Sequence, residues 1–90
     1  MIEVHPIEEE TYAVTCMADN PAEYVVTLED EYYLRITDGN VLPEELVEHS
    51  VVFFMDRAKM GAEIPERFDV STMAMRYPEF EAVIRQKLRR

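Results

Sequence analysis

The fold is decided by residues 24–37, which read Tyr24-Val25-Val26-Thr27-Leu28-Glu29-Asp30-Glu31-Tyr32-Tyr33-Leu34-Arg35-Ile36-Thr37. Two runs rich in aromatic and β-branched residues flank three acidic residues, a pattern typical of a β-hairpin. If the acidic residues form the loop, six large apolar side chains share one face: Tyr24, Val26, Leu28, Tyr32, Leu34 and Ile36. The other face then carries Val25, Thr27, Tyr33 and Arg35. Because a three-residue loop usually contains glycine and this one has none, a longer turn remains an alternative.

The segments on either side complete an α+β pattern. Thr11–Cys16 alternates with the period of a strand, placing Tyr12, Val14 and Cys16 on one face, and the segment Met17–Glu23 interrupts it. Downstream, Pro43 and two glutamates predict a helix from near Leu42 to about Met60, with Gly61 as its cap. We therefore expect an antiparallel β-meander of about three strands, followed by a long helix and two shorter C-terminal helices packed on one sheet face.

The two shorter helices are predicted from their capping signals. Asp69 is a good N-cap, and Phe68 before it can pack on Met73, so a short helix begins here and ends by Tyr77. Pro78 disfavours helical geometry in the residue before it and can itself open a third helix, whose apolar face is Phe80, Val83, Ile84 and Leu88.

Two residues of the predicted long helix break its apolar pattern. Val52 projects onto the polar side, and Arg57 projects onto the apolar side. We interpret Val52 as an isolated exposed valine and Arg57 as a side chain that extends toward water near the helix end, with a role in an interface as the alternative.

The composition indicates one acidic domain over residues 1–90. Of the 90 residues, 48% are hydrophobic, and the formal net charge is −10. Residues 1–48 hold thirteen acidic residues against Arg35 alone, whereas residues 76–90 hold five basic residues against Glu79 and Glu81. This charge argues against direct binding to nucleic acid or to an anionic membrane. No run approaches the roughly 20 apolar residues of a membrane span, and no secretory signal is recognisable, so we expect a cytoplasmic protein.

The sequence offers little that points to catalysis, to a metal or to a cofactor. Cys16 is the only cysteine, and His5 and His49 are far apart, so we predict no metal site and interpret Cys16 as a core residue. The runs of carboxylates lie in predicted loops, and Asp38-Gly39-Asn40 lacks the ordered ligands of a calcium loop. With two glycines in the chain there is no phosphate-binding loop, and we predict no cofactor.

Four segments resemble a family: Glu23–Tyr33, Pro43–Glu48, Phe68–Val70 and Tyr77–Glu81. They resemble small uncharacterised bacterial proteins with an acidic hairpin, a Glu-Glu-Leu-Val-Glu helix and a closing Pro-Glu-aromatic-Glu motif. The resemblance covers roughly residues 23–81 and implies an arrangement of turns, caps and core, with no activity attached.

Three function classes follow from these observations. The first is a non-catalytic protein-binding module or accessory subunit, contacting its partner through Val25, Tyr33 and Arg35 on the second hairpin face or through Val52. The second is an acidic nucleic-acid mimic, such as an antitoxin or a phage-type inhibitor, that binds a basic partner through Glu29, Asp30 and Glu31. The third is a small enzyme or metal-dependent regulator. A homodimer would use the exposed hairpin edge or Val52.

Overall fold

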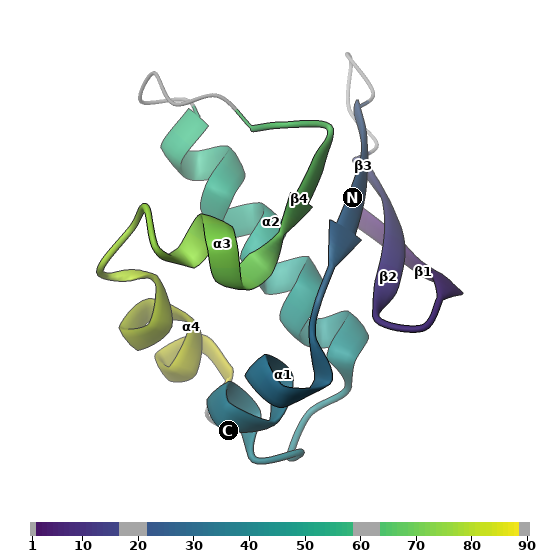
Figure 1. Cartoon of the computed structure of the whole chain (residues 1–90). Helices are drawn as coiled ribbons and strands as arrows, with labels where there is room; N and C mark the ends of the chain where they lie inside the picture. The colour runs from purple at the N-terminus through teal and green to yellow at the C-terminus, as the bar shows by residue number, and fades with distance from the viewer. Residues whose placement is uncertain (1, 17–21, 59–63, 89–90) are drawn as a thin grey trace.

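The computed structural model describes residues 2–16, 22–58 and 64–88 and shows an α+β fold (Figure 1). Its elements are β1 (Ile2–Glu8), β2 (Thr11–Cys16), β3 (Ala22–Thr27), α1 (Asp30–Thr37), α2 (Pro43–Ala58), β4 (Arg67–Asp69), α3 (Val70–Ala74) and α4 (Phe80–Leu88). The strands form one sheet in the order β1-β2-β3-β4. The first two pairings are antiparallel, and β4 pairs with β3 in parallel. The expected α+β class is confirmed, but the sheet is mixed and four-stranded rather than an antiparallel three-stranded meander.

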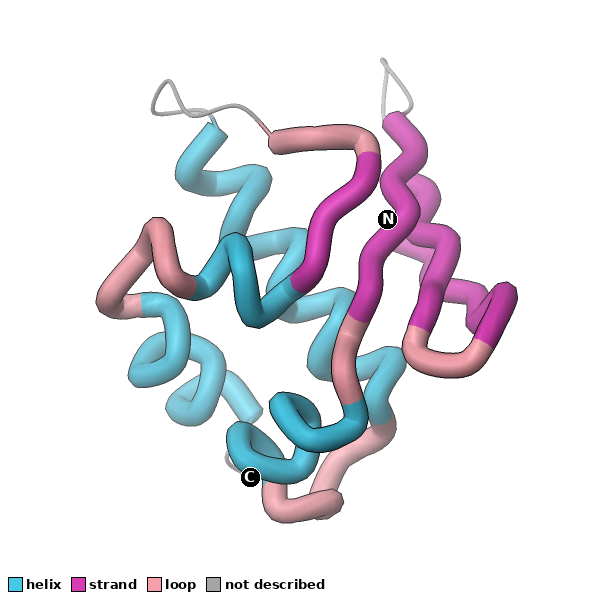
Figure 2. The backbone as a smooth tube through the Cα atoms, viewed as in Figure 1, coloured by secondary structure: helices cyan, strands magenta, loops and turns pink. Residues whose placement is uncertain are grey.

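The predicted hairpin over residues 24–37 is wrong in its second half. Residues Asp30–Thr37 form a helix, and β3 pairs with β2 and β4 instead (Figure 2). Tyr32 and Ile36, one helical turn apart, are buried, whereas Leu34, which the hairpin would have buried, is 53% exposed. Asp30 and Glu31 lie in the first helical turn and Glu29 is the N-cap, and the helix dipole favours negative charge at this end.

The helix α1 is fixed at both ends by polar contacts. Its Asp30 N–H donates to a carboxylate oxygen of Glu10 at 2.7 Å, so the turn between β1 and β2 caps the helix. At the other end Asp38 adopts a left-handed backbone with φ 55°, and its N–H donates to the Leu34 carbonyl. These contacts explain why this segment is a helix although its apolar residues also fit a strand.

The strand predicted over Thr11–Cys16 is confirmed as β2. Val14 and Cys16 are buried on the face that the alternation indicated, and Val14 lies opposite Val4 of β1 and Tyr24 of β3. The strand β1 was not predicted: Ile2, Val4 and Ile7 are β-formers, but Pro6 interrupts the run. The interruption predicted over residues 17–23 lies mostly outside the described residues.

The helices after residue 42 match the prediction in part. The helix α2 begins at Pro43 and is described to Ala58, so the predicted end at Met60 and the cap at Gly61 lie outside the described residues. Asp69 caps α3 by accepting a hydrogen bond from the Ser71 N–H, and α3 ends at Ala74, before Pro78. In α4, Phe80 and Ile84 are fully buried, and Val83 and Leu88 pack partly against the core. The three-residue strand β4 was missed, because so short a strand has no periodicity of its own.

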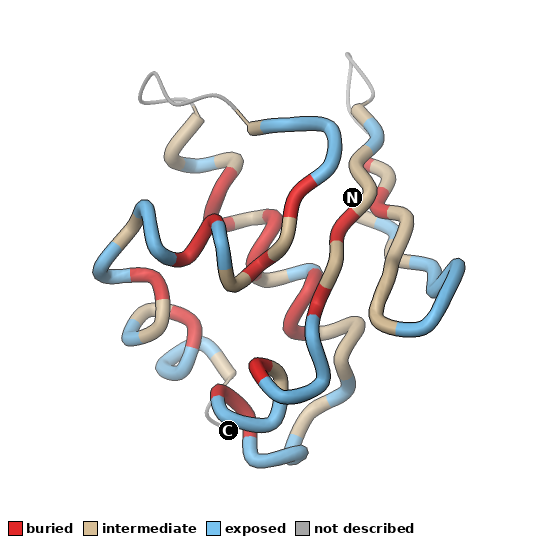
Figure 3. Tube along the Cα trace, in the orientation of Figure 1, coloured by how far each residue is buried: buried red, intermediate tan, exposed pale blue. Residues whose placement is uncertain are grey.

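An aromatic cluster holds the helices against the sheet. Phe54 of α2 stacks on Phe80 of α4 with ring centroids 5.1 Å apart, and it meets Phe68 of β4 edge-on at 5.5 Å. Phe53 lies 5.2 Å from the Phe80 ring. The buried residues form a band between the sheet and the helices (Figure 3), so burial is concentrated on one face of the sheet.

Candidate functional site

The sheet has a second face that no described helix covers. Along each strand, buried residues such as Val14, Val26 and Phe68 alternate with residues that point the opposite way. The register aligns Ala13 of β2 with Val25 of β3, and Val25 with Arg67 of β4. We call this surface the outer face; its members are Glu3, His5, Thr11, Ala13, Thr15, Glu23, Val25, Thr27, Arg67 and Asp69. The helices lie together on the other side of the sheet (Figure 1).

A shallow groove crosses the outer face. Its larger part has a volume of about 870 Å³ and is lined by Ala13, Val14, Thr15, Ala22, Glu23, Tyr24, Val25, Ile64, Glu66 and Arg67. A smaller part of about 460 Å³ is lined by Ile7, Glu8, Thr11, Thr27 and the same Val25 and Arg67. The two parts adjoin at Val25 and Arg67, which line both, and we call them together the sheet groove.

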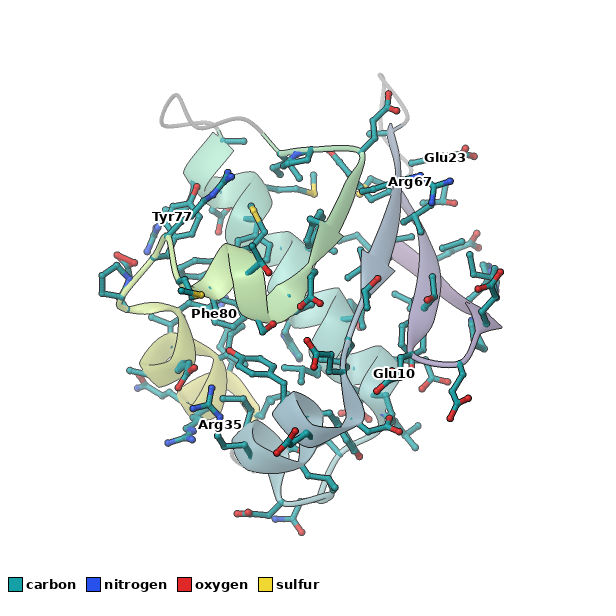
Figure 4. All side chains as sticks on the ribbon, in the orientation of Figure 1. Glu10, Glu23, Arg35, Arg67, Tyr77 and Phe80 are labelled. Carbon is teal, nitrogen blue, oxygen red and sulfur yellow. The ribbon has the colours of Figure 1, made fainter. Side chains whose placement is uncertain are left out.

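The sheet groove has small side chains in its floor and carboxylates around it. Threonines, Ala13 and Val25 make up the floor, and none of them is fully buried. The carboxylates of the outer face and the groove are Glu3, Glu8, Glu23, Glu66 and Asp69. Arg67 is the one arginine or lysine in this set of described residues, and it lies near Glu23 at the upper end of the sheet (Figure 4). The surface is therefore acidic, with an apolar centre.

The structure places only one of the expected contact residues in this groove. Val25 lies in its centre, as part of the face opposite the core. Tyr33 is half-buried, and its hydroxyl donates to the Val41 carbonyl, so it links α1 to the segment before α2. Val52 is half-buried on α2 rather than exposed. The expected grouping of Val25, Tyr33 and Arg35 on one hairpin face is wrong, because the second hairpin strand is a helix.

Arg35 belongs to a network between α1 and α4. Its guanidinium pairs with the Glu81 carboxylate at 3.1 Å and lies 5.0 Å from the centre of the Tyr32 ring. The Tyr32 hydroxyl donates to the same carboxylate at 3.1 Å. Burial, followed by the charge of Glu81, raises the pKa of Tyr32, so this phenol stays protonated and acts as a donor. These contacts join α1 to α4, so the position of Arg35 is explained by interactions within the chain.

Arg57 likewise makes contacts within the chain. Its guanidinium lies 4.4 Å from the centre of the Phe53 ring, and it pairs with Glu79 at 3.7 Å. The side chain thus covers the aromatic cluster while its charge stays near water, as expected for an arginine at an apolar helix position.

Glu29, Asp30 and Glu31 are exposed at the start of α1 rather than in a hairpin loop. Asp69, at the end of β4, raises the pKa of Glu29 through the repulsion between the two carboxylates. Glu10, the acidic residues at the start of α1 and Asp69 thus bring negative charge from three separate parts of the chain to the lower end of the outer face.

Of the groups often used in catalysis, Cys16 lies in the core and His5 lies on the surface. The Cys16 thiol is buried and donates to the Met55 sulfur at 3.5 Å, and burial raises its pKa, which disfavours the reactive thiolate. His5 is exposed beside Glu3, at 3.9 Å. Within residues 2–16, 22–58 and 64–88, no group of three or more His, Cys, Asp or Glu side chains could hold a metal ion.

Sequence reasoning missed most of the sheet groove. The alternation of Thr11–Cys16 did assign Thr11, Ala13 and Thr15 to the face away from the core, which was a usable signal. Ile7, Ile64 and Arg67 could not be added to it, because β1 and β4 were not predicted.

None of the helices in the described part of the chain is long and apolar enough to cross a membrane.

Comparisons with protein-family models, curated proteins and solved structures find no match to this chain, so the geometry is the guide to function.

Proposed function

We propose that this chain is a non-catalytic protein-binding domain that docks a partner on the outer face of its sheet. The observation that carries the proposal is the one-sided arrangement of the fold: α2 packs against β1 and β2 on one side of the sheet, and the sheet groove lies on the other. An open sheet face is a surface that another element of secondary structure can cover, in the way that helices cover the inner face.

The lining of the groove supports binding rather than chemistry. Threonine methyl groups, Ala13, Val25 and the half-buried Ile64 offer a contact surface of low relief. Ile7, at the lower end, is 53% exposed, which adds an apolar contact of the kind found at the centre of protein interfaces.

A matched pair of variants tests this proposal. Ile7 in the groove and Leu34 on α1 are both 53% exposed, so Ile7→Lys and Leu34→Lys add the same charge at equal exposure. We expect a protein captured in stoichiometric amount from native lysate by the unmodified chain and by Leu34→Lys, and lost with Ile7→Lys. Loss with both variants, loss with Leu34→Lys alone, or no captured protein at any salt concentration would count against docking on the outer face.

An acidic mimic that blocks a basic partner is the second candidate. The observation in its favour is the gathering of Glu10, Glu29, Asp30 and Asp69 from three parts of the chain. This candidate expects binding that double-stranded DNA competes away and that Ile7→Lys leaves unchanged. Neutralising Glu29, Asp30 and Glu31 together would abolish such binding, whereas a partner in the sheet groove would be retained.

A further inference from the structure

The sheet groove has the length and the apolar line that suit one helix. Ile64 lines its larger part, Ile7 its smaller part and Val25 both, and Ile64 also packs partly against the core. Since Ile7 belongs to β1 and Ile64 precedes β4, this line crosses the four strands, which span about 14 Å at the usual strand spacing. A helix of about 13 residues is about 20 Å long and can cross the sheet, with its apolar positions at i, i+3, i+4 and i+7 along that line.

The negative charge around the groove indicates which kind of partner would bind there. Three carboxylates, Glu8, Glu23 and Glu66, line it against Arg67 alone, so the charged residues of its lining carry a net charge of −2 (three negative, one positive). A second copy of this chain, face to face, would bring two such surfaces together, and like charges in contact are unfavourable. A helix with lysine or arginine on both sides of its apolar stripe would instead meet carboxylates along both walls.

We infer that the sheet groove receives a basic amphipathic helix of a partner protein, with its apolar stripe on Ile64, Val25 and Ile7 and its basic side chains toward the surrounding carboxylates. The inference rests on the proposed function, since it specifies what docks on the outer face. Arg67, which lines both parts of the groove, adds a selective element: an acidic residue of the docked helix that faces it would pair with it, and an arginine at that position would be repelled.

Synthetic peptides test the inference on the full chain. The probe is a 14-residue peptide with leucine at the i, i+3, i+4, i+7 and equivalent positions and lysine on both flanks. One control peptide has glutamate in place of every lysine, and another has the same composition in an order that leaves no apolar stripe. Each is titrated into the isotopically labelled chain while the backbone amide signals are followed by NMR.

We expect the basic amphipathic peptide alone to shift the amides of Ala13, Thr15 and Val25. Ile7→Lys should weaken its binding about tenfold, the cost of placing a charge in an apolar contact. Glu23→Gln should weaken it about threefold at low salt, as is usual for an exposed charge pair, and Glu48→Gln, an exposed glutamate on α2, should have no effect. Leu34→Lys should also leave the affinity unchanged.

Three results would overturn the inference. The first is equal binding of the peptide without an apolar stripe, which would show attraction by charge alone. The second is a set of shifts confined to α1 and α4. If the basic peptide fails to bind while a captured partner is still lost with Ile7→Lys, the outer face remains the docking surface and only the identity of the occupant is wrong. If the peptide binds in the groove but no captured partner depends on Ile7, the proposed function fails instead.

Discussion

Substitutions of Glu10 can separate two opposing effects on stability: the loss of its hydrogen bond to the start of α1 and the relief of its backbone strain. Glu10 accepts the Asp30 N–H at 2.7 Å, and it does so from a left-handed backbone with φ 63°. Loss of a capping side chain costs about 1 kcal/mol. A left-handed backbone on a residue other than glycine also costs about 1 kcal/mol, so glycine at this position would recover part of that strain.

The substitutions Glu10→Ala and Glu10→Gly therefore have different expected effects. Glu10→Ala removes the cap and keeps the strain, so it should lower the free energy of unfolding by about 1 kcal/mol. Glu10→Gly removes both, and it should lie within about 0.5 kcal/mol of the unmodified chain. Glu10→Gln, which keeps a neutral acceptor but loses the charge at the helix N-terminus, should cost about 0.5 kcal/mol.

Urea denaturation, followed by circular dichroism, measures the free energy of unfolding of all three variants. A difference of about 1 kcal/mol corresponds to a shift of about 4–8 °C in Tm for a chain of this size, which a thermal scan resolves. A Glu10→Gly variant that is less stable than Glu10→Ala would refute the assignment of strain to Glu10. A Glu10→Ala variant with unchanged stability would show that the carboxylate does not cap α1.

Three further perturbations have defined outcomes. Phe54→Ala removes a fully buried ring at a cost of about 3–5 kcal/mol, comparable to the whole stability of so small a domain, so its circular dichroism spectrum should be that of an unfolded chain at 25 °C. Glu29→Gln relieves the repulsion from Asp69 and should raise Tm at pH 7. Because the pKa of Glu29 is raised in the folded state, this gain in Tm should shrink as the pH falls toward 4.5 and as salt is added. A gain in Tm that persists at pH 4 would contradict this explanation. Cys16 should react with a thiol reagent such as dithionitrobenzoate only after unfolding, and fast labelling of the native chain would contradict its burial.

The predictable part of the fold was the part whose signals do not depend on tertiary contacts. The start of α2 at Pro43, the Asp69 cap and the buried face of β2 follow from local rules of capping and alternation. Residues 30–37 were ambiguous, because Tyr32 and Ile36 are spaced equally well for a helix and for every second position of a strand. One of the two contacts that fix the ends of the helix comes from Glu10, twenty residues away, and cannot be read from a local pattern.

The same tertiary dependence limited the candidate site. Val25 was placed on the correct face because β3 was predicted with the correct alternation. Tyr33 and Arg35 were grouped with it only through the hairpin, and the helix turns both toward contacts within the chain. Arg67 could not be found, since β4 exists only where β3 supplies a parallel partner.

Both edge strands of the sheet are poorly suited to pairing with a strand of another chain, which favours the outer face as the docking surface. On one edge, β1 contains Pro6, which has no N–H to donate, and its register shifts between Pro6 and Glu8. Its neighbouring carboxylates, Glu3 and Glu8, are exposed, and such features are those by which proteins prevent strand addition at an edge. On the other edge, β4 has only three residues and leads directly into α3, too short to template a partner strand. A homodimer built by pairing strands is therefore disfavoured at both edges, and the long edge strand expected at residues 32–37 is a helix. What the sheet presents for contact is the outer face, where Val25 and Ile7 are accessible and the surrounding charge is negative.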